Sequence, residues 1–155
     1  MPHSFEGSLD APQGRFAIAV SRYNESITGK LLAGAVQTLA DHGVADDAID
    51  VAWAPGAFEI PLVADRLASS GQYVAVLALG AVIRGETTHD RHINRAVSLG
   101  LMEAGLRSGV PVLFGILTCD SVEQAIHRAG GNVGNKGIEC AEAALRMANL
   151  LPQLP

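Results

Sequence analysis

The chain has 155 residues, with 11 Lys and Arg, 16 Asp and Glu, and a formal net charge of -5. This length fits a single domain spanning residues 1–155, and a hydrophobic content of 48% excludes a disordered chain. The acidic balance argues against a nucleic-acid partner. The two lysines, Lys30 and Lys136, are too few for a membrane-binding patch.

No segment predicts export or membrane insertion. The longest apolar run, residues 73–83, contains a glycine and falls short of the roughly 20 residues that span a bilayer. Residues 1–13 have neither a basic n-region nor an apolar h-region, so we expect no signal peptide. Two cysteines, Cys119 and Cys140, predict no disulfide framework and no metal site. We therefore expect a cytoplasmic protein.

Strand and helix patterns alternate along the whole chain. The first predicted strand, residues 16–20, leads into a helix that Asn24 can cap and Gly43 ends. The later strands are expected at residues 49–54, 74–79 and 112–117. The later helices are expected at residues 61–70 and 88–107, at a short segment capped by Ser121 with Gln124, and after the glycine-rich residues 130–137. This order predicts a four-stranded parallel sheet with helices on both faces.

The third predicted helix has two apolar stripes. One stripe comprises Ile93, Ala96, Val97, Gly100, Leu101 and Ala104, and the other comprises Leu99, Met102 and Leu106. A helix that is apolar on two faces is buried on two sides. In a chain this small we expect the second face to meet another subunit, although a helix enclosed within its own domain has the same pattern.

Ligands of parallel α/β sheets bind at the carboxyl ends of the strands. The expected functional loops are therefore residues 21–24, 55–59 and 81–89 and the segment after Thr118. Residues 84–89 (RGETTH) join a buried strand to a helix start, where free N–H groups, threonine hydroxyls and the helix dipole can hold an anion. Gly85 allows close backbone approach there.

His89 is the strongest candidate for chemistry. In the first helical turn, the positive dipole end favours its neutral, proton-accepting form, which suits general acid–base catalysis. A capping loop followed by a surface histidine would have the same sequence pattern. The remaining histidines lack such a position and are predicted to be surface residues; they are His3, His42, His92 and His127.

Four further side chains can serve either a ligand or the fold. Glu59 can accept hydrogen bonds from ligand hydroxyls or simply favour a helix start. Tyr23 can stack on a heterocycle or cover the sheet edge. Arg128 can clamp a phosphate or compensate a helix C-terminus. Phe114 lies within a predicted strand, where core packing is the ordinary role. Dinucleotide, P-loop, zinc-protease and serine-hydrolase motifs are absent from the sequence.

Taken together, these segments closely resemble the lumazine synthase family over about residues 5–150. The motifs that carry the resemblance are 21–24 (SRYN), 55–61 (PGAFEIP), 80–89 (GAVIRGETTH), 112–115 (VLFG), 123–130 (EQAIHRAG) and 134–137 (GNKG). The resemblance implies a flavodoxin-like α/β/α sandwich. It also implies the condensation of 5-amino-6-(D-ribitylamino)uracil with 3,4-dihydroxy-2-butanone 4-phosphate, without metal or organic cofactor.

The family pattern assigns roles by position. It implies Tyr23 and Asn24 at the pyrimidine, Ala57, Phe58 and Glu59 at the ribityl chain, and backbone contacts from Ala81, Val82 and Ile83. Gly85, Glu86 and Thr87 would form the phosphate loop with Arg128 as its cation, and His89 would transfer protons. Phe114 and Lys136 would come from a neighbouring subunit.

The resemblance further implies a homo-oligomer of pentamers. The short loop at residues 130–137 is similar to that of members that build 60-subunit shells, with riboflavin synthase as an encapsulated partner, and residues 1–13 would pack on a neighbouring subunit. The chain departs from the family at Tyr23, usually Phe or Trp, at residues 90–92 (DRH), usually aromatic-acid-aromatic, and at Asn132, which can be lysine.

Two other functions remain open at this point. A non-catalytic flavin-binding or shell-forming paralogue would need neither His89 nor the phosphate cation. A flavodoxin-like electron carrier would need a hydroxyl-rich phosphate loop after the first strand, where this chain has residues 21–24 (SRYN) instead.

Overall fold

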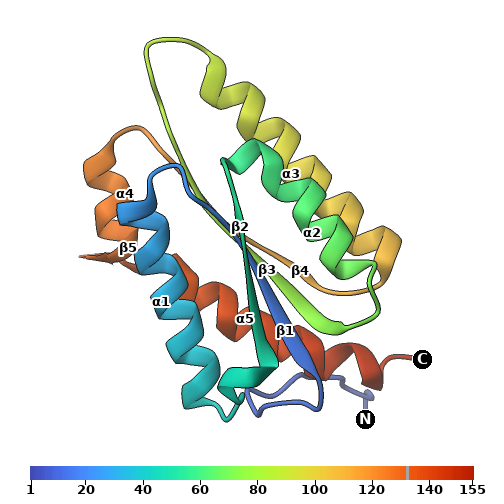
Figure 1. The fold of residues 1–155 in the computed structure, drawn as a ribbon. Coiled ribbons are helices and arrows are strands. Elements are labelled where there is room, and N and C mark those ends of the chain that lie inside the picture. The colour runs from blue at the N-terminus through green and yellow to red at the C-terminus, as the bar shows by residue number, and fades with distance from the viewer. Residues whose placement is uncertain (132) are drawn as a thin grey trace.

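A computed structural model describes residues 1–131 and 133–155 of the chain. One parallel sheet lies between two layers of helices (Figure 1). Its strands are β1 (Arg15–Ser21), β2 (Ile49–Ala54), β3 (Tyr73–Ile83) and β4 (Val112–Cys119), in the order β2-β1-β3-β4. The helices are α1 (Glu25–Asp41), α2 (Ile60–Ala68), α3 (His89–Ser108), α4 (Val122–Arg128) and α5 (Lys136–Leu150).

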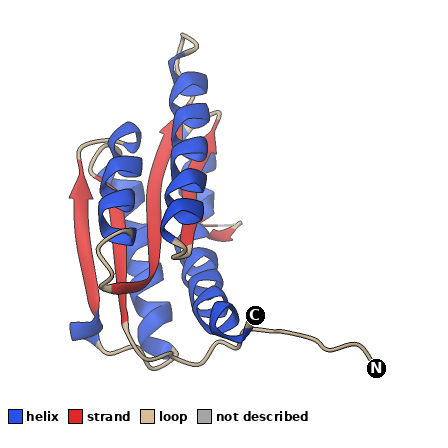
Figure 2. Ribbon diagram, turned by 90° about the vertical axis from the view of Figure 1, so that its right-hand side faces the viewer, coloured by secondary structure: helices blue, strands red, loops and turns tan. Residues whose placement is uncertain are grey.

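The predicted architecture is confirmed. Helices α1 and α5 cover one face of the sheet and α2 and α3 cover the other, which is the three-layer, flavodoxin-like arrangement (Figures 1 and 2). Three single-turn helices, η1 (Asp46–Ala48), η2 (Ala57–Glu59) and η3 (Leu151–Gln153), complete the connections. The glycine-rich segment before α5 also forms a small antiparallel pair, β5 (Ala129–Gly131) and β6 (Gly134–Asn135), which the sequence did not predict.

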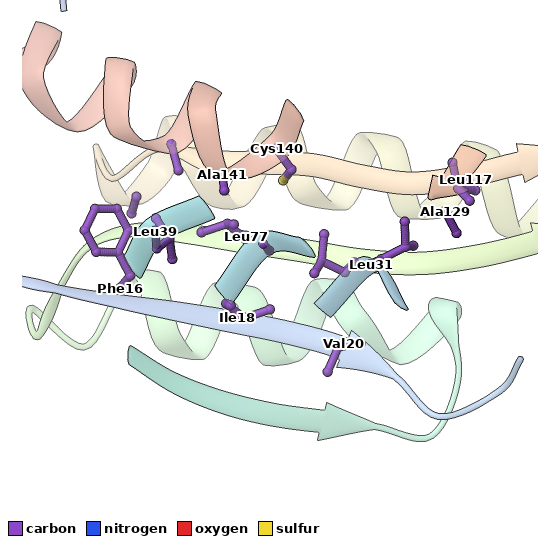
Figure 3. Packing of buried hydrophobic residues seen from close by; sticks show 14 of the residues in the cluster. Phe16, Ile18, Val20, Leu31, Leu39, Leu77, Leu117, Ala129, Cys140 and Ala141 are labelled. Atoms are coloured by element: carbon purple, nitrogen blue, oxygen red, sulfur yellow. The ribbon is translucent and has the colours of Figure 1, made fainter. Parts of the chain in front are cut away.

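Side-chain size alternates along β1 and sets the thickness of the two layers. Phe16, Ile18 and Val20 enter the cluster under α1 and α5, as Figure 3 shows. Ala17 and Ala19 point to the opposite face, toward α2 and α3. All five side chains are fully buried. Because successive residues of a strand face opposite sides, this alternation lets large side chains fill one layer while small ones let the other helices pack close.

Helix α3 confirms the prediction of two apolar faces. Val97, Leu101 and Ala104 are buried against the sheet. On the outer face, Leu99, Met102 and Leu106 are 59%, 62% and 78% exposed. Ala96, predicted in the buried stripe, is exposed because it lies at the edge of that stripe. The outer face of α3 is therefore a continuous apolar surface that the single chain leaves open.

The N-terminal segment is fastened to its own chain over part of its length. The Gln153 side-chain amide donates to the Glu6 carbonyl at 2.7 Å, and Asn149 donates to the Ser8 and Asp10 carbonyls at 3.0 and 2.7 Å. These bonds hold residues 6–10 along α5. Residues 1–5 are exposed and extend away from the body (Figure 2). Packing on a neighbouring subunit thus remains a prediction for that exposed end.

A charged cluster ties the starts of three strands together. The Asp50 carboxylate accepts one hydrogen bond from the Tyr73 hydroxyl at 2.6 Å and one from the Arg15 guanidinium at 2.8 Å. Arg15 also donates to the Asp47 carbonyl at 2.7 Å. The Tyr73 hydroxyl, and then Arg15, lower the pKa of Asp50 because both stabilise the charged carboxylate. Asp50 also raises the pKa of Tyr73.

Asp50→Asn is expected to lower the free energy of unfolding at pH 7, with a smaller loss in acid. A carboxylate whose pKa is lowered by folding adds stability above its unfolded pKa of about 3.9, and that stability disappears as the pH falls through the lowered value. Urea unfolding at pH 7 and pH 3 measures the difference. Asp47→Asn is the control, since Arg15 binds only the backbone carbonyl of Asp47. An equal loss at both pH values would contradict the role of the Asp50 carboxylate.

Candidate active site

A crevice of about 910 Å³ opens where β1, β2 and β3 end at their carboxyl edge. It is the edge at which the strand order predicted a ligand site. Residues from the turns after β1 and β2, from the end of β3 and the connection that follows it, and from the starts of α3 and α4 line it; they are Tyr23, Asn24, Gly56, Ala57, Phe58, Glu59, Ala81, Val82, Ile83, Gly85, Thr87, His89, Asp90, His92, Ile93 and Val122.

The turn after β1 presents Tyr23 at the mouth of this crevice. The backbone N–H of Tyr23 donates to the Pro55 carbonyl at 3.0 Å, which extends the pairing of β1 with β2. The Tyr23 side chain is 73% exposed, so its ring face is available to a ligand. It does not cover the sheet edge. On that edge Trp53 is covered instead by the Arg22 guanidinium, which lies 4.5 Å from the ring centroid.

Asn24 has a different role from the predicted helix cap. It precedes α1 with φ of 63°, a left-handed conformation that asparagine tolerates, and its side chain makes no capping hydrogen bond. Its Nδ2 donates instead to the Ala81 carbonyl at 3.2 Å. The side chain therefore connects the β1–α1 turn to the end of β3, and Oδ1 has no hydrogen-bond partner among the described residues.

The turn after β2 carries Ala57, Phe58 and Glu59 in the single-turn helix η2. Ala57 is buried, whereas Phe58 is 60% exposed. Glu59 caps α2 by position only, since its side chain makes no capping bond. Pro61 follows in the first turn of α2, as predicted. No ion pair or hydrogen bond within the described residues engages the Glu59 carboxylate, so it can accept hydrogen bonds from a ligand.

The prediction that residues 81–83 form part of a loop is wrong, because Ala81, Val82 and Ile83 belong to β3. They pair with Leu117, Thr118 and Cys119 of β4, which extends beyond its predicted end and keeps β3 extended. On the other side, the pairing of β3 with β1 ends at Leu79. The backbone groups of residues 80–83 that face β1 are consequently unpaired by the sheet, apart from the Ala81 carbonyl that accepts from Asn24. This strand edge offers ordered donors and acceptors to the crevice.

The connection from β3 to α3 is exposed and contains the predicted anion loop. Gly85 and Thr87 line the crevice, and Glu86 does not. The Thr87 hydroxyl accepts from the backbone N–H of His89 at 3.2 Å, which ends the loop at the first residue of α3. None of the described residues lies within 4 Å of the position that a Cβ would take at Gly85, so packing within the chain does not require a glycine there.

His89 lines the crevice from the start of α3, as the sequence predicted. Its imidazole has no hydrogen-bond partner among the described residues. His92 is exposed, as predicted for a surface residue, but it also lines the same crevice together with Asp90, which the sequence analysis did not predict. The helical spacing from His89 to His92 would have revealed it, since residues three apart share a helix face.

A second, smaller hollow of about 370 Å³ gathers the other predicted ligand residues. Phe114 of β4, Arg128 at the end of α4 and Lys136 at the start of α5 line it. Phe114 is 43% exposed and not a core residue, because β4 is an edge strand of the sheet. Arg128 and Lys136 give this hollow two cations. Asn132, a predicted departure in the neighbouring loop, lies outside the described residues.

Neither cysteine is available as a nucleophile. Burial raises the pKa of the Cys140 thiol to about 12 and also raises the pKa of the Cys119 thiol, so both are protonated at neutral pH. Among the residues that the structure describes, no group of three His, Cys, Asp or Glu side chains is positioned to hold a metal ion. None of the helices described is both long enough and apolar enough to cross a membrane.

The fold and the crevice define a flavodoxin-like α/β protein with a small-molecule site at the carboxyl edge of its sheet. The family model for 6,7-dimethyl-8-ribityllumazine synthase matches residues 13–152. The chain therefore belongs to the 6,7-dimethyl-8-ribityllumazine synthase family, a family of riboflavin biosynthesis whose members act on small molecules as oligomers.

Proposed function

We propose that the chain condenses 5-amino-6-(D-ribitylamino)uracil with 3,4-dihydroxy-2-butanone 4-phosphate to form 6,7-dimethyl-8-ribityllumazine, the reaction for which its family is named. The 5-amino group attacks the ketone and loses water to form an imine. Phosphate then leaves, and attack of the ribitylamino nitrogen with loss of a second water closes the ring. These reaction steps depend on proton transfer and on proximity of the reactants, which can lower the activation barrier by about 7–11 kcal/mol.

The division of the ligand residues between two hollows is the observation that carries this proposal. The crevice holds an exposed ring, a strand edge, a free carboxylate and His89, but none of the lysines and arginines among the described residues lines it. The second hollow holds Phe114 with the cations Arg128 and Lys136. We infer that the second hollow of one copy closes the crevice of the next, so that each complete site is shared by two subunits.

In the proposed site the pyrimidine lies on Tyr23, and its polar edge pairs with the free backbone groups of residues 81–83. The ribityl hydroxyls reach the Glu59 carboxylate and the Oδ1 of Asn24, beside Ala57 and Phe58. Phe114 and Lys136 of the adjacent copy cover the pyrimidine. The unpaired edge of β3 supports this assignment, because a heterocyclic amide needs ordered donors and acceptors at fixed spacing.

The phosphate of the second substrate is assigned to the loop at residues 85–87 (Gly85, Glu86 and Thr87) and to Arg128 of the adjacent copy. Free backbone N–H groups at the start of α3 and a planar guanidinium together form a strong phosphate site. Glu86 contributes through its backbone, since its side chain does not line the crevice. His89, next to this loop, moves protons between the reacting atoms.

The assembly proposed is a ring of five copies, and the short loop at residues 130–137 favours a 60-subunit shell that encloses riboflavin synthase. The exposed outer face of α3 supports copy-to-copy contact, because Leu99, Met102 and Leu106 would otherwise remain in water. Phe58 on η2 and Leu62 on α2 are further exposed apolar side chains. We assign the protein to the cytoplasm.

Mixing both substrates with the purified protein tests the proposal. We expect the absorbance and fluorescence of the lumazine to appear, with release of one phosphate per lumazine formed. A non-catalytic paralogue would bind the pyrimidine or a flavin without releasing phosphate. Binding without product would contradict the proposed enzyme and favour that second function, which the exposed Tyr23 ring would also serve.

A further inference from the structure

The first turn of α3 brings a second imidazole to the crevice. His92 lies three residues after His89, and residues three apart on a helix lie on the same face. Both histidines line the same crevice, with the Asp90 carboxylate between them in sequence. The site therefore contains two imidazoles, the side-chain group that most often serves in proton transfer.

One contact at the start of α3 orients the ring of His92. Its Nε2 lies 3.5 Å from the Thr88 hydroxyl, one helical turn earlier. Thr88 precedes α3 and makes no side-chain cap, so its hydroxyl is free to serve the imidazole. Among the described residues this is the only side-chain hydrogen bond of His92, which leaves Nδ1 for a ligand or a water in the crevice.

The proposed reaction includes several proton transfers in which a second imidazole could take part. During elimination the C3–H bond of the imine breaks, and its electron pair forms the C3=C4 double bond. The C4–O bond breaks, and phosphate leaves with that electron pair. When the resulting enol becomes a ketone, C4 gains a proton and the C3 hydroxyl loses one. Imine formation and ring closure move further protons from nitrogen to the departing water. A single imidazole must gain or lose a proton between these steps. With two imidazoles, one can accept a proton while the other donates one.

We propose that His92 is a second proton-transfer residue of this site and carries protons in place of His89 when His89 is absent. The inference rests on the proposed function. Two observations support the inference: His89 and His92 line the same crevice within one helical turn of each other, and the Thr88 hydroxyl contacts the His92 ring.

A double-mutant cycle of His89→Gln and His92→Gln tests the inference, with kcat measured at saturating substrates. We expect His92→Gln to slow the His89→Gln protein about tenfold more than it slows the wild type, because removing both of two groups that can replace each other costs more than the two single losses combined. Arg91→Gln is the matched control, since Arg91 is in the same turn but does not line the crevice. It should have the same small effect in both backgrounds.

Failure of the proposed function and failure of the inference about His92 give different experimental results. If the wild-type protein forms no lumazine, the proposed function fails. If the wild type is active but His92→Gln has the same factor in both backgrounds, His92 acts only through packing or helix stability, and the inference is overturned. Thermal unfolding of each variant identifies loss of fold. In that case His92→Asn, which keeps a side-chain amide nearer the helix, repeats the cycle.

Discussion

Replacing His89 with alanine is expected to lower kcat about 10²-fold without abolishing turnover. His89 lines the crevice from the first residue of α3 with its imidazole unpaired among the described residues. Its removal takes away a proton carrier but leaves the surfaces that hold the two substrates together. Proximity of the reactants is therefore retained, and so is the imidazole of His92.

Steady-state kinetics with both substrates saturating measures this loss. His42→Ala is the control, because His42 ends α1 at the opposite end of the sheet, where its Nδ1 lies 2.8 Å from the Thr38 carbonyl oxygen. That variant should alter stability and leave kcat unchanged. An unchanged kcat for His89→Ala would contradict proton transfer by His89.

Arg128→Ala is expected to raise the KM for the butanone phosphate about 10- to 100-fold, the range expected when a charged hydrogen-bond partner of a phosphate is lost. The KM for the pyrimidine should change far less, because the pyrimidine is assigned to Tyr23 and the edge of β3. Arg128 lies in the hollow with Phe114 and Lys136, away from the crevice that contains His89. In the proposed shared site, Arg128 acts on the substrate that is bound in the crevice of an adjacent copy.

Arg128→Lys separates charge from shape. Lysine keeps the positive charge but cannot form the paired, planar hydrogen bonds of a guanidinium, so an intermediate KM is expected. Equal increases for both substrates would contradict the assignment of Arg128 to the phosphate. They would indicate instead that the substitution disturbs the subunit contact.

The order of elements was predictable because local patterns and tertiary packing agree. Local patterns predicted each of three elements: an apolar run predicted β3, a glycine predicted the end of α1, and the spacing of apolar residues predicted α5. Ser121 caps α4 as predicted, accepting from the Gln124 N–H at 3.2 Å. The Gln124 side chain, however, bonds back to the N–H of Asp120, one residue before the cap. What failed was the length of β3, since its last residues are held by β4, a partner distant in sequence.

The site residues show the same contrast between local and distant causes. His89 and Glu59 were predictable because each lies just after a strand, where the topology places ligands. Phe114 was predicted as core from its strand alone, but the sheet order leaves β4 at the edge. The contact of Asn24 with Ala81 joins residues on two different strand ends. No pattern along the chain could reveal that contact.

The electron-carrier alternative receives no support from the turn after β1. Of its residues, Asn24 binds the Ala81 carbonyl, and Arg22 pairs with Glu25 at 2.8 Å. The Nδ2 group of Asn24 and the Arg22 guanidinium are therefore engaged within the chain. The turn lacks the cradle of hydroxyl and backbone donors that would hold a flavin phosphate there.

Mixing two defective variants tests the shared site most directly. His89→Ala subunits keep Arg128, and Arg128→Ala subunits keep His89, so a ring assembled from both contains junctions with both native residues. After joint unfolding and reassembly in equal amounts, about a quarter of the sites in a head-to-tail ring should be native. We predict that activity at low butanone phosphate rises well above the sum of the two separate variants. Activity no greater than that sum would contradict a site built from two subunits.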